Sequence, residues 1–374
     1  MRIAFLCKRR YMGKDVIAER YARLYEIPFQ LARLGHDVRG FCLSYQGHAA
    51  GEWVHDAGTG RGRLTWESRS LGRLYAPALA GYPLHLLRRL RDFAPDIVIG
   101  ASDIPHVVLG AWLAKRINRP YAADLYDNFE SFGQAHIPGL VGALRRAIRN
   151  ADLVTTTSEP LSELIRTGYR ARGEVIAMPS TVDTVVFRPR DPSACRRNLG
   201  LPEKGVLIGT AGNLRKDKGV DALYAAWPVV AAAHPHAQLV LAGPHDHDFP
   251  PPRHARVHYL GTLPHARTAE LFCALDVGVI YLRDTAFGRY CFPQKAYEML
   301  ACELPLVAAA VGVMPTLLAD TPAVLYRAED AHDLARAITA QLSDRRRPNV
   351  AIEDWAALIR RLEPRLKALR ARTV

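Results

Sequence analysis

The sequence predicts an α/β protein made of two doubly wound, Rossmann-like domains that face a cleft. Strand-like apolar runs alternate with helical stretches along almost the whole chain of 374 residues. This alternation is typical of parallel sheets covered by helices on both faces. The chain is long enough for two domains, each with its own core. Its hydrophobic content of 49% and charged content of 23% are those of an ordinary globular protein.

Short apolar runs predict the buried strands, because a strand that is covered on both faces is apolar throughout. In the first half these runs are RIAFLC (2–7), DVRGFCLSY (37–45), DIVIGAS (96–102) and YAADLY (121–126). In the second half they are VLIGTAG (206–212), QLVLAG (238–243), VHYLG (257–261), VGVIYL (277–282) and PLVAAA (305–310). Helical stretches fall between them.

A proline-rich and charged segment, MPSTVDTVVFRPRDPSACR, lies between a predicted strand and the next helix. That composition is typical of a linker. We therefore expect an N-terminal domain at residues 1–185 and a C-terminal domain at residues 186–350. The tail, residues 351–374, is predicted to be an amphipathic helix with Trp355 and Leu358 on one face.

The composition narrows the class of partner. No apolar run approaches the length of a membrane-spanning helix, and the N-terminal apolar stretch is too short for a signal-peptide core, so we expect a cytoplasmic protein. The six cysteines are scattered without a disulfide-like spacing and are expected to be small core residues. The formal net charge of +13 favours phosphorylated ligands, an anionic membrane surface or nucleic acid, although no aromatic-rich RNA-binding signature is present.

The predicted strand that ends near Gly212 leads into a loop rich in glycine and cations. Arg215, Lys216 and Lys218 follow, and a helix is expected to start near Gly219. Diphosphate needs this combination, because glycine lets the backbone approach, a helix N-terminus offers free N–H groups, and fixed cations balance the charge. The spacing is not that of a P-loop, since no GK[ST] sequence is present. A solvated surface loop is the competing interpretation.

Residues 287–307 combine a turn, a helix and a buried strand around one acid, Glu298. Gly288 and Pro293 supply the turn, and the apolar run from Leu304 begins the strand. A carboxylate at this place can accept hydrogen bonds from a ribose diol, and the helix N-terminus can bind phosphate. The alternative is an exposed glutamate on a helix surface.

These segments, in this order, resemble the retaining glycosyltransferases of family 4. The stretch 292–307 resembles the family's SPLKLFEYMAAGKPVV, with matches at Pro293, Lys295, Glu298, Ala301 and Pro305. The cationic loop resembles GRLxxxKG, with matches at Gly212, Leu214, Lys218 and Gly219, and with Asn213 in place of the arginine. The linker resembles PNGVDxxxF, with matches at Asp183 and Phe187. The resemblance covers nearly the whole chain.

The resemblance implies the glycosyltransferase-B (GT-B) architecture and a transferase activity. A sugar would pass, with retention of anomeric configuration, from a nucleoside-diphosphate sugar to a glycan or lipid-linked acceptor in surface polysaccharide synthesis. The family implies no covalent nucleophile, no cofactor and no required metal. It also implies that the C-terminal helix crosses back onto the first domain.

The resemblance assigns roles to individual residues of the second domain. Lys218, with Arg215 or Asn213, would hold the diphosphate and stabilise charge on the departing phosphate. Glu298 would hold the ribose. The other donor-binding residues would be Gly212, Gly261, Thr262, Leu263, Tyr290, Cys291, Phe292 and Pro293. Tyr290 stands where family members commonly carry a first glutamate, so the identity of the donor sugar stays open.

The first domain offers fewer candidates. Gly13 lies between a predicted strand and a long helix, where backbone can approach a ligand. Asp124 and Asp127 lie at the C-terminal end of a predicted strand, in a segment that resembles the family's YDxHDxxPE with Tyr126 at the histidine position. Asp127 and Gly13 would then face the transferred sugar or the acceptor. A strand-end cap is the alternative for either acid.

Other interpretations stay open. A sugar-nucleotide epimerase shares the fold. A non-catalytic protein that binds nucleotides or nucleic acid fits the positive charge, although the family implies no nucleic acid partner.

Asp246 and Asp248, near several histidines, could form a metal site, but a surface loop is the default. Arginine-rich helical runs at residues 88–91 and 145–149 favour an anionic membrane surface as a partner. The nucleobase, the sugar, the acceptor, the linkage and the oligomeric state are left undetermined.

Overall fold

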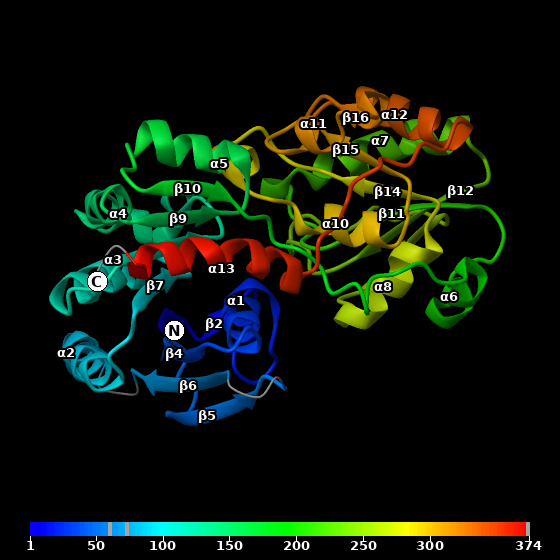
Figure 1. Ribbon diagram of the computed structural model, residues 1–374. Coiled ribbons are helices and arrows are strands. Elements are labelled where there is room, and N and C mark those ends of the chain that lie inside the picture. The colour runs from blue at the N-terminus through cyan, green and yellow to red at the C-terminus, as the bar shows by residue number, and fades with distance from the viewer. Residues whose placement is uncertain (59–61, 72–74, 372–374) are drawn as a thin grey trace. The chain divides into compact units, whose positions relative to one another are not determined.

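The computed structural model describes residues 1–58, 62–71 and 75–371, and the chain forms two compact units. Unit 1 is made of residues 1–180 together with the C-terminal residues from 355 onward, and unit 2 is made of residues 181–354. The last three residues of the predicted tail segment, 372–374, lie outside the described residues. Each unit is built around a mostly parallel sheet with helices packed on it (Figure 1).

The sheet of unit 1 has eight strands in the order β10-β9-β8-β7-β1-β4-β6-β5. Neighbouring strands pair in parallel, except that β5 pairs with β6 in antiparallel fashion. The central strands are apolar and buried, as expected for strands covered on both faces. The strands are β1 Arg2–Lys8, β4 Asp37–Ser44, β5 Gly51–Asp56, β6 Arg63–Ser70, β7 Ile97–Ala101, β8 Tyr121–Leu125, β9 Leu153–Thr156 and β10 Glu174–Ala177, and a separate hairpin joins β2 Arg10–Tyr11 to β3 Lys14–Asp15.

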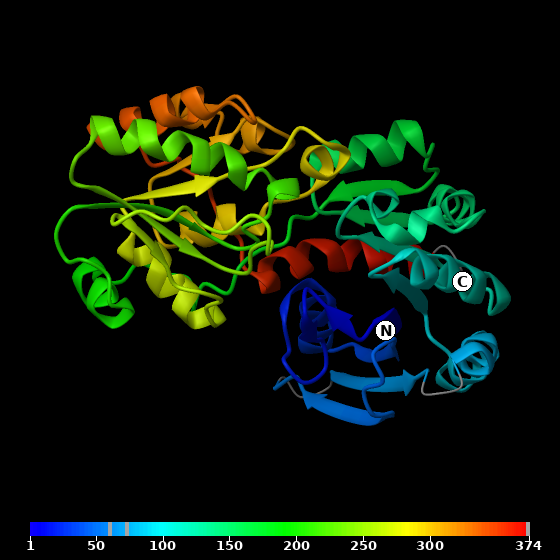
Figure 2. The ribbon, with the colours of Figure 1, turned by 180° about the vertical axis from the view of Figure 1, so that it is seen from behind.

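The C-terminal helix belongs to unit 1, where it packs beside α1 (Figures 1 and 2). Its apolar face, which includes Trp355, Leu358 and Leu362, is buried in the same core as β1 and α1. A hydrogen bond of 2.8 Å between the His36 and Glu363 side chains adds to this contact. The helices of this unit are α1 Ala22–Arg33, α2 Tyr75–Phe93, α3 Ile104–Arg116, α4 Leu140–Arg149, α5 Glu159–Glu163 and α13 Trp355–Ala371.

Unit 2 has a parallel sheet of six strands in the order β13-β12-β11-β14-β15-β16. Its strands are β11 Val206–Ala211, β12 Ala237–Ala242, β13 Val257–Tyr259, β14 Val277–Ile280, β15 Leu306–Ala309 and β16 Leu325–Tyr326. Its helices are α6 Pro192–Leu199, α7 Val220–Ala233, α8 His265–Ala274, α9 Ala286–Tyr290, α10 Gln294–Ala301, α11 Met314–Leu317 and α12 Ala331–Ser343. One continuous apolar core joins these elements.

Each sheet has one switch point, where strands that follow later in the chain are added on the opposite side of the first strand. In unit 1 this point lies between β1 and β7, and in unit 2 it lies between β11 and β14. Open α/β sheets bind ligands outside the carboxyl ends of their strands at such points. The residues that leave β11 and β14, and those that leave β1 and β7, are therefore the first places to look for a site.

The predicted α/β class with parallel sheets is confirmed, and each predicted strand is present. The apolar pattern of the sequence did not predict β2, β3, β5, β6, β9, β10 or β16. Gly13 lies in the turn of the β2–β3 hairpin with a φ of +83°, and the first helix begins only at Ala22. None of the helices in the described ranges has the length and apolar character that a membrane crossing requires.

Candidate functional site

The loop that leaves β11 approaches the end of β12 so closely that glycine is required there. A Cβ on Gly243 would lie 1.9 Å from the carbonyl oxygen of Gly212, and both glycines have a φ of +125°. The N–H of Gly212 donates to the carbonyl of Ala242 over 3.0 Å. The backbone at the β11–β14 switch point is thus fixed without any side chain of its own, which leaves it accessible to a ligand.

Lys218, the predicted diphosphate ligand, lies at the end of this loop. Its ammonium nitrogen is 3.5 Å from the centroid of the Phe287 ring. Gly219 follows in the left-handed conformation, with a φ of +97°, and α7 begins directly after it. Within the described parts of the chain, no carboxylate lies within ion-pairing distance of Lys218. Its positive charge is therefore held by an aromatic face rather than neutralised by an acid.

Arg215, the loop cation that the resemblance pairs with Lys218, is already paired. Its Nε lies 2.9 Å from Asp217 and 3.5 Å from Asp246, and the side chain is half exposed. Asp246 also accepts a hydrogen bond from the backbone N–H of Lys216 over 3.2 Å. The acid that the sequence offered as a metal ligand thus contacts the cationic loop. Among the residues with described positions, no cluster of three or more histidines, cysteines or acids is placed to hold a metal ion.

Lys295 is a further cation of this site, to which the sequence analysis assigned no role. Its Nζ lies 3.2 Å from the position that a Cβ on Gly212 would occupy, and 4.4 Å from the centroid of the Tyr281 ring. The Tyr281 hydroxyl in turn donates to the carbonyl of Asn213 over 2.8 Å. The residues that leave β11, β14 and the start of α10 therefore meet at the switch point. The family-like match at Lys295 was the signal in the sequence that could have found it.

Glu298, the predicted ribose ligand, lies one turn after Lys295 on α10. Burial raises the pKa of Glu298 to about 7, while the positive charge of Lys295 opposes this shift. Burial lowers the pKa of Lys295 to about 8, while the negative charge of Glu298 opposes it. Both groups therefore titrate near neutral pH, and strongly shifted pKa values of this kind gather at functional sites.

The remaining predicted donor-binding residues lie in two further segments of unit 2, after β13 and around the end of α9. The carbonyl of Gly261 accepts from the N–H of Gly243 over 2.7 Å, which ties this turn to the β11 loop. Thr262 is exposed and Leu263 packs partly on the core. Tyr290 is the last residue of α9, and Cys291, Phe292 and Pro293 join α9 to α10; Cys291 and Pro293 are buried.

In unit 1, a lysine and a tyrosine lie at the switch point between β1 and β7. The N–H of Lys8, at the end of β1, donates to the Ser102 hydroxyl after β7 over 2.8 Å. The Lys8 ammonium donates to the Tyr126 hydroxyl over 3.0 Å. Burial lowers the pKa of Lys8, and the nearby charge of Asp103 opposes this shift. Tyr126 thus occupies the family's histidine position with a cation beside it, a pairing that the sequence reasoning did not predict.

The two candidate acids of unit 1 differ in their surroundings. Asp124 is fully engaged with Arg23 in a buried ion pair of 2.6 Å, and its carboxylate also accepts from the hydroxyl of Thr155 over 2.5 Å. Asp127, next to Tyr126, is buried, and its Oδ1 accepts from the N–H of Asn128 over 2.8 Å. Asp124 thus stabilises the end of β8.

Gly13 has open space beside its Cα. A Cβ placed on it would have no other atom within 4 Å.

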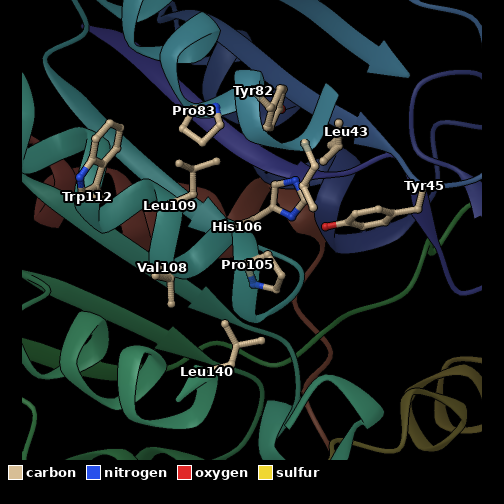
Figure 3. A pocket seen from close by; sticks show the side chains of 11 residues that line it. Leu43, Tyr45, Tyr82, Pro83, Pro105, His106, Val108, Leu109, Trp112 and Leu140 are labelled. Atoms are coloured by element: carbon tan, nitrogen blue, oxygen red, sulfur yellow. The ribbon is translucent and has the colours of Figure 1, made fainter. Parts of the chain in front are cut away.

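Unit 1 also contains an apolar pocket of about 490 Å³ that no sequence motif predicted (Figure 3). It lies between α2, α3, the start of α4 and the end of β4. Its volume is within the usual range for small-molecule sites. The lining residues are Leu43, Tyr45, Leu79, Tyr82, Pro83, Pro105, His106, Val108, Leu109, Trp112 and Leu140.

The basic runs of unit 1 are partly neutralised. On α2, Arg89 pairs with Glu67 at 2.7 Å and with Glu52 at 2.5 Å. On α4, Arg145 pairs with Glu130 at 2.7 Å. Other arginines of the same helices are exposed, namely Arg88, Arg91, Arg146 and Arg149. Large apolar side chains are exposed nearby in the sequence, at Leu84 on α2 and at Ile137 before α4.

Comparison with known families and proteins agrees with this geometry. The family described as "Glycosyl transferases group 1" matches residues 205–344, and the family described as "Glycosyl transferase 4-like domain" matches residues 22–180. A D-inositol 3-phosphate glycosyltransferase from Stackebrandtia nassauensis is 32% identical over 64% of this chain and 56% of its own length. A GDP-mannose-dependent monoacylated alpha-(1-6)-phosphatidylinositol monomannoside mannosyltransferase from Corynebacterium glutamicum is 26% identical over 57% of this chain and 58% of its own. The chain spans about half the length of the curated relatives that it matches.

Solved structures share the fold at low sequence identity. Sucrose-phosphate synthase from Thermosynechococcus elongatus is 19% identical and superposes with a TM-score of 0.68, covering 98% of this chain and 94% of its own. Anabaena HepE in complex with UDP-glucose is 18% identical, with a TM-score of 0.65, and covers 100% of this chain and 98% of its own. The fold is that of the GT-B glycosyltransferases. The two matched families together span most of the described residues, and the chain belongs to the group 1 glycosyl transferases, with a glycosyl transferase 4-like N-terminal domain.

Proposed function

We propose that this protein transfers a sugar from a nucleoside-diphosphate sugar to a glycan or lipid-linked acceptor, with retention of anomeric configuration and without a metal. In this proposal Lys218 holds the diphosphate and stabilises the charge that develops on the departing phosphate, which is usually the largest catalytic term. Glu298 accepts hydrogen bonds from the ribose hydroxyls. From unit 1, Asp127 and Gly13 contact the transferred sugar or the acceptor.

One observation carries the proposal. Lys218 and Glu298 lie near the β11–β14 switch point with charges that no described partner neutralises within 4 Å, beside backbone that glycines keep accessible. Both side chains are partly buried. Partly buried charges without a close counter-charge, near a parallel-sheet switch point, favour a ligand that supplies the missing partners. A nucleoside diphosphate offers both partners, since its phosphates are anionic and its ribose donates hydrogen bonds.

The acceptor is proposed to have an apolar part and to be held at an anionic membrane surface, in the synthesis of a surface glycan. The apolar pocket of unit 1 and the exposed Leu84 on the basic helix α2 support this view. The relatives named above act on D-inositol 3-phosphate and on a phosphatidylinositol mannoside, so that a lipid-linked acceptor has a precedent among them.

A thermal-shift screen of nucleoside diphosphates and nucleotide sugars tests the donor part, because a ligand that binds only the folded state raises the melting temperature. We expect at least one nucleoside diphosphate to raise it by several degrees. The donor found in this way is then incubated with and without candidate acceptors. Nuclear magnetic resonance of the product's anomeric signal reports retention or inversion. A new sugar nucleotide formed without any acceptor would instead identify an epimerase.

A further inference from the structure

The loop after β11 carries no cation at position 213, where the family's GRLxxxKG segment has its arginine. Asn213 stands at the arginine position of that segment. Arg215 is the nearest cation in the sequence, but its guanidinium is half exposed and lies between Asp217 and Asp246. Two acids already balance its single charge. A diphosphate carries more negative charge than one lysine can balance, so Lys218 needs a second cation from elsewhere.

Lys295 is placed where that second cation is needed. Its Nζ lies 3.2 Å from the Cβ position of Gly212, so the absence of a side chain on Gly212 provides the space that the ammonium group occupies. The Tyr281 ring, which is buried, lies 4.4 Å away and shields the other side of the ammonium group. Because the Tyr281 hydroxyl also binds the carbonyl of Asn213, the same tyrosine fixes both the loop and the lysine.

The position of Lys295 is unfavourable for a lysine that serves only the fold. Burial lowers its pKa to about 8, although Glu298 lies one turn further along α10. The structure places no carboxylate within 4 Å of it in the described ranges. The Lys295 side chain is partly buried. A partly buried cation without a close acid destabilises the free protein, and an anion that binds beside it recovers this cost.

We propose that Lys295 supplies the second cation of the diphosphate site. It would have the role that the sequence suggested for Arg215. The inference rests on the proposed function and deepens it, because it names the groups that meet the two phosphates. Lys218 approaches from the end of the loop and Lys295 from the first turn of α10, with the backbone of Gly212 beside Lys295. Tyr281 is a positioning residue, because its ring contacts the Lys295 ammonium group and its hydroxyl binds the carbonyl of Asn213.

Calorimetric titration with inorganic diphosphate tests this assignment in the full-length protein. We expect Lys295→Met to weaken diphosphate binding at least tenfold, the loss typical of one charge-assisted hydrogen bond, and Lys295→Arg to stay within about threefold of the unmodified protein. Arg215→Ala should weaken binding less than Lys295→Met does. The matched control is Lys204→Met, which removes a lysine from an exposed turn before β11 and should leave binding unchanged.

The melting temperature and the binding of diphosphate by the unmodified protein distinguish a wrong assignment of Lys295 from a wrong proposed function. The melting temperature of ligand-free Lys295→Met should be equal to or higher than that of the unmodified protein, since the variant removes a partly buried charge that has no close acid. A clear decrease would identify a structural lysine and overturn the assignment. If the unmodified protein binds diphosphate and Lys295→Met binds it equally well, only the role assigned to Lys295 is contradicted. If the unmodified protein binds neither inorganic diphosphate nor any nucleoside diphosphate, the proposed function falls with it.

Discussion

The ammonium group of Lys218 lies over the ring of Phe287, 3.5 Å from its centroid, and so joins the loop after β11 to helix α9. The quadrupole of the ring attracts the cation without neutralising it. The arrangement fixes the lysine in the free protein and keeps its charge for a ligand. Phe287 is half-buried and packs against the core of unit 2, so the lysine is held by a rigid support.

Lys218→Ala should lower turnover by about a hundredfold to a thousandfold, because loss of one preorganised donor to developing charge has that cost. The measurement is the steady-state rate with the donor found by thermal shift. Lys204→Ala, on an exposed turn, is the matched control and should keep full activity. Turnover of Lys218→Ala within about threefold of the unmodified protein would contradict the assignment.

Glu298→Gln should weaken the binding of the nucleoside diphosphate by about tenfold or more, because a carboxylate that accepts two hydroxyl hydrogen bonds loses charge assistance. The binding of inorganic diphosphate, which has no ribose, should change much less. Calorimetry with both ligands therefore distinguishes a ribose contact from a general loss of the site. Equal affinities of the variant and the unmodified protein for the nucleoside diphosphate would make Glu298 a structural acid.

The stability of the protein should depend on pH through Glu298. Its pKa is raised from the usual 4.5 to about 7 by burial, so the folded state retains a proton that the unfolded state releases between these two values. The folded protein therefore loses stability, relative to Glu298→Gln, as the pH rises from about 4.5 to 7. The melting temperature of the variant minus that of the unmodified protein should increase between pH 5 and pH 7.5. A difference that stays constant, or that decreases, would show that Glu298 is not buried in its ionised form.

Activity should persist in excess EDTA. Asp246, the acid most suggestive of a metal site in the sequence, is engaged with the N–H of Lys216 and with Arg215. Cations from the protein then perform the charge balance that a divalent metal performs in other transferases. The test compares initial rates before and after chelation. Complete loss that manganese or magnesium restores would overturn this expectation and return attention to Asp246 and Asp248.

The protein should co-sediment with vesicles that contain anionic lipid at low salt and be released at high salt, since each arginine near the surface contributes about 1 kcal/mol. The double variant Arg88→Ala with Arg91→Ala, on the exposed side of α2, should weaken partitioning onto the vesicles by roughly thirtyfold, the effect of about 2 kcal/mol. Lys204→Ala controls for the loss of charge elsewhere on the surface. Absence of binding to anionic vesicles at low salt would remove the membrane part of the proposal and leave the transferase part standing.

The sequence by itself determined the class of fold and the central strands of both sheets. Strands such as Ile97–Ala101 and Leu306–Ala309 are buried on both faces, so their apolar character is visible in the sequence without knowledge of their neighbours. It also predicted Lys218 and Glu298 as ligands of the donor, because a glycine-rich loop and a helix with one acid are local patterns. The strands that it missed were less regular. β5 and β6 carry polar side chains, as in Arg63–Ser70, and β9 and β10 are short.

Only the tertiary structure decided which of the candidate groups meet. Arg215 and Lys218 are near each other in the sequence, yet the fold gives Arg215 two acids and gives Lys218 an aromatic face. Lys295 reaches the side of Gly212 because β11 and β14 are neighbours in the sheet and α10 follows β14. The physical reason is that the charge state and the availability of a side chain depend on distances of a few ångströms between segments far apart in the chain. Local patterns carry the periodicity of helices and strands, but such distances are set only when the strands pair and the helices pack.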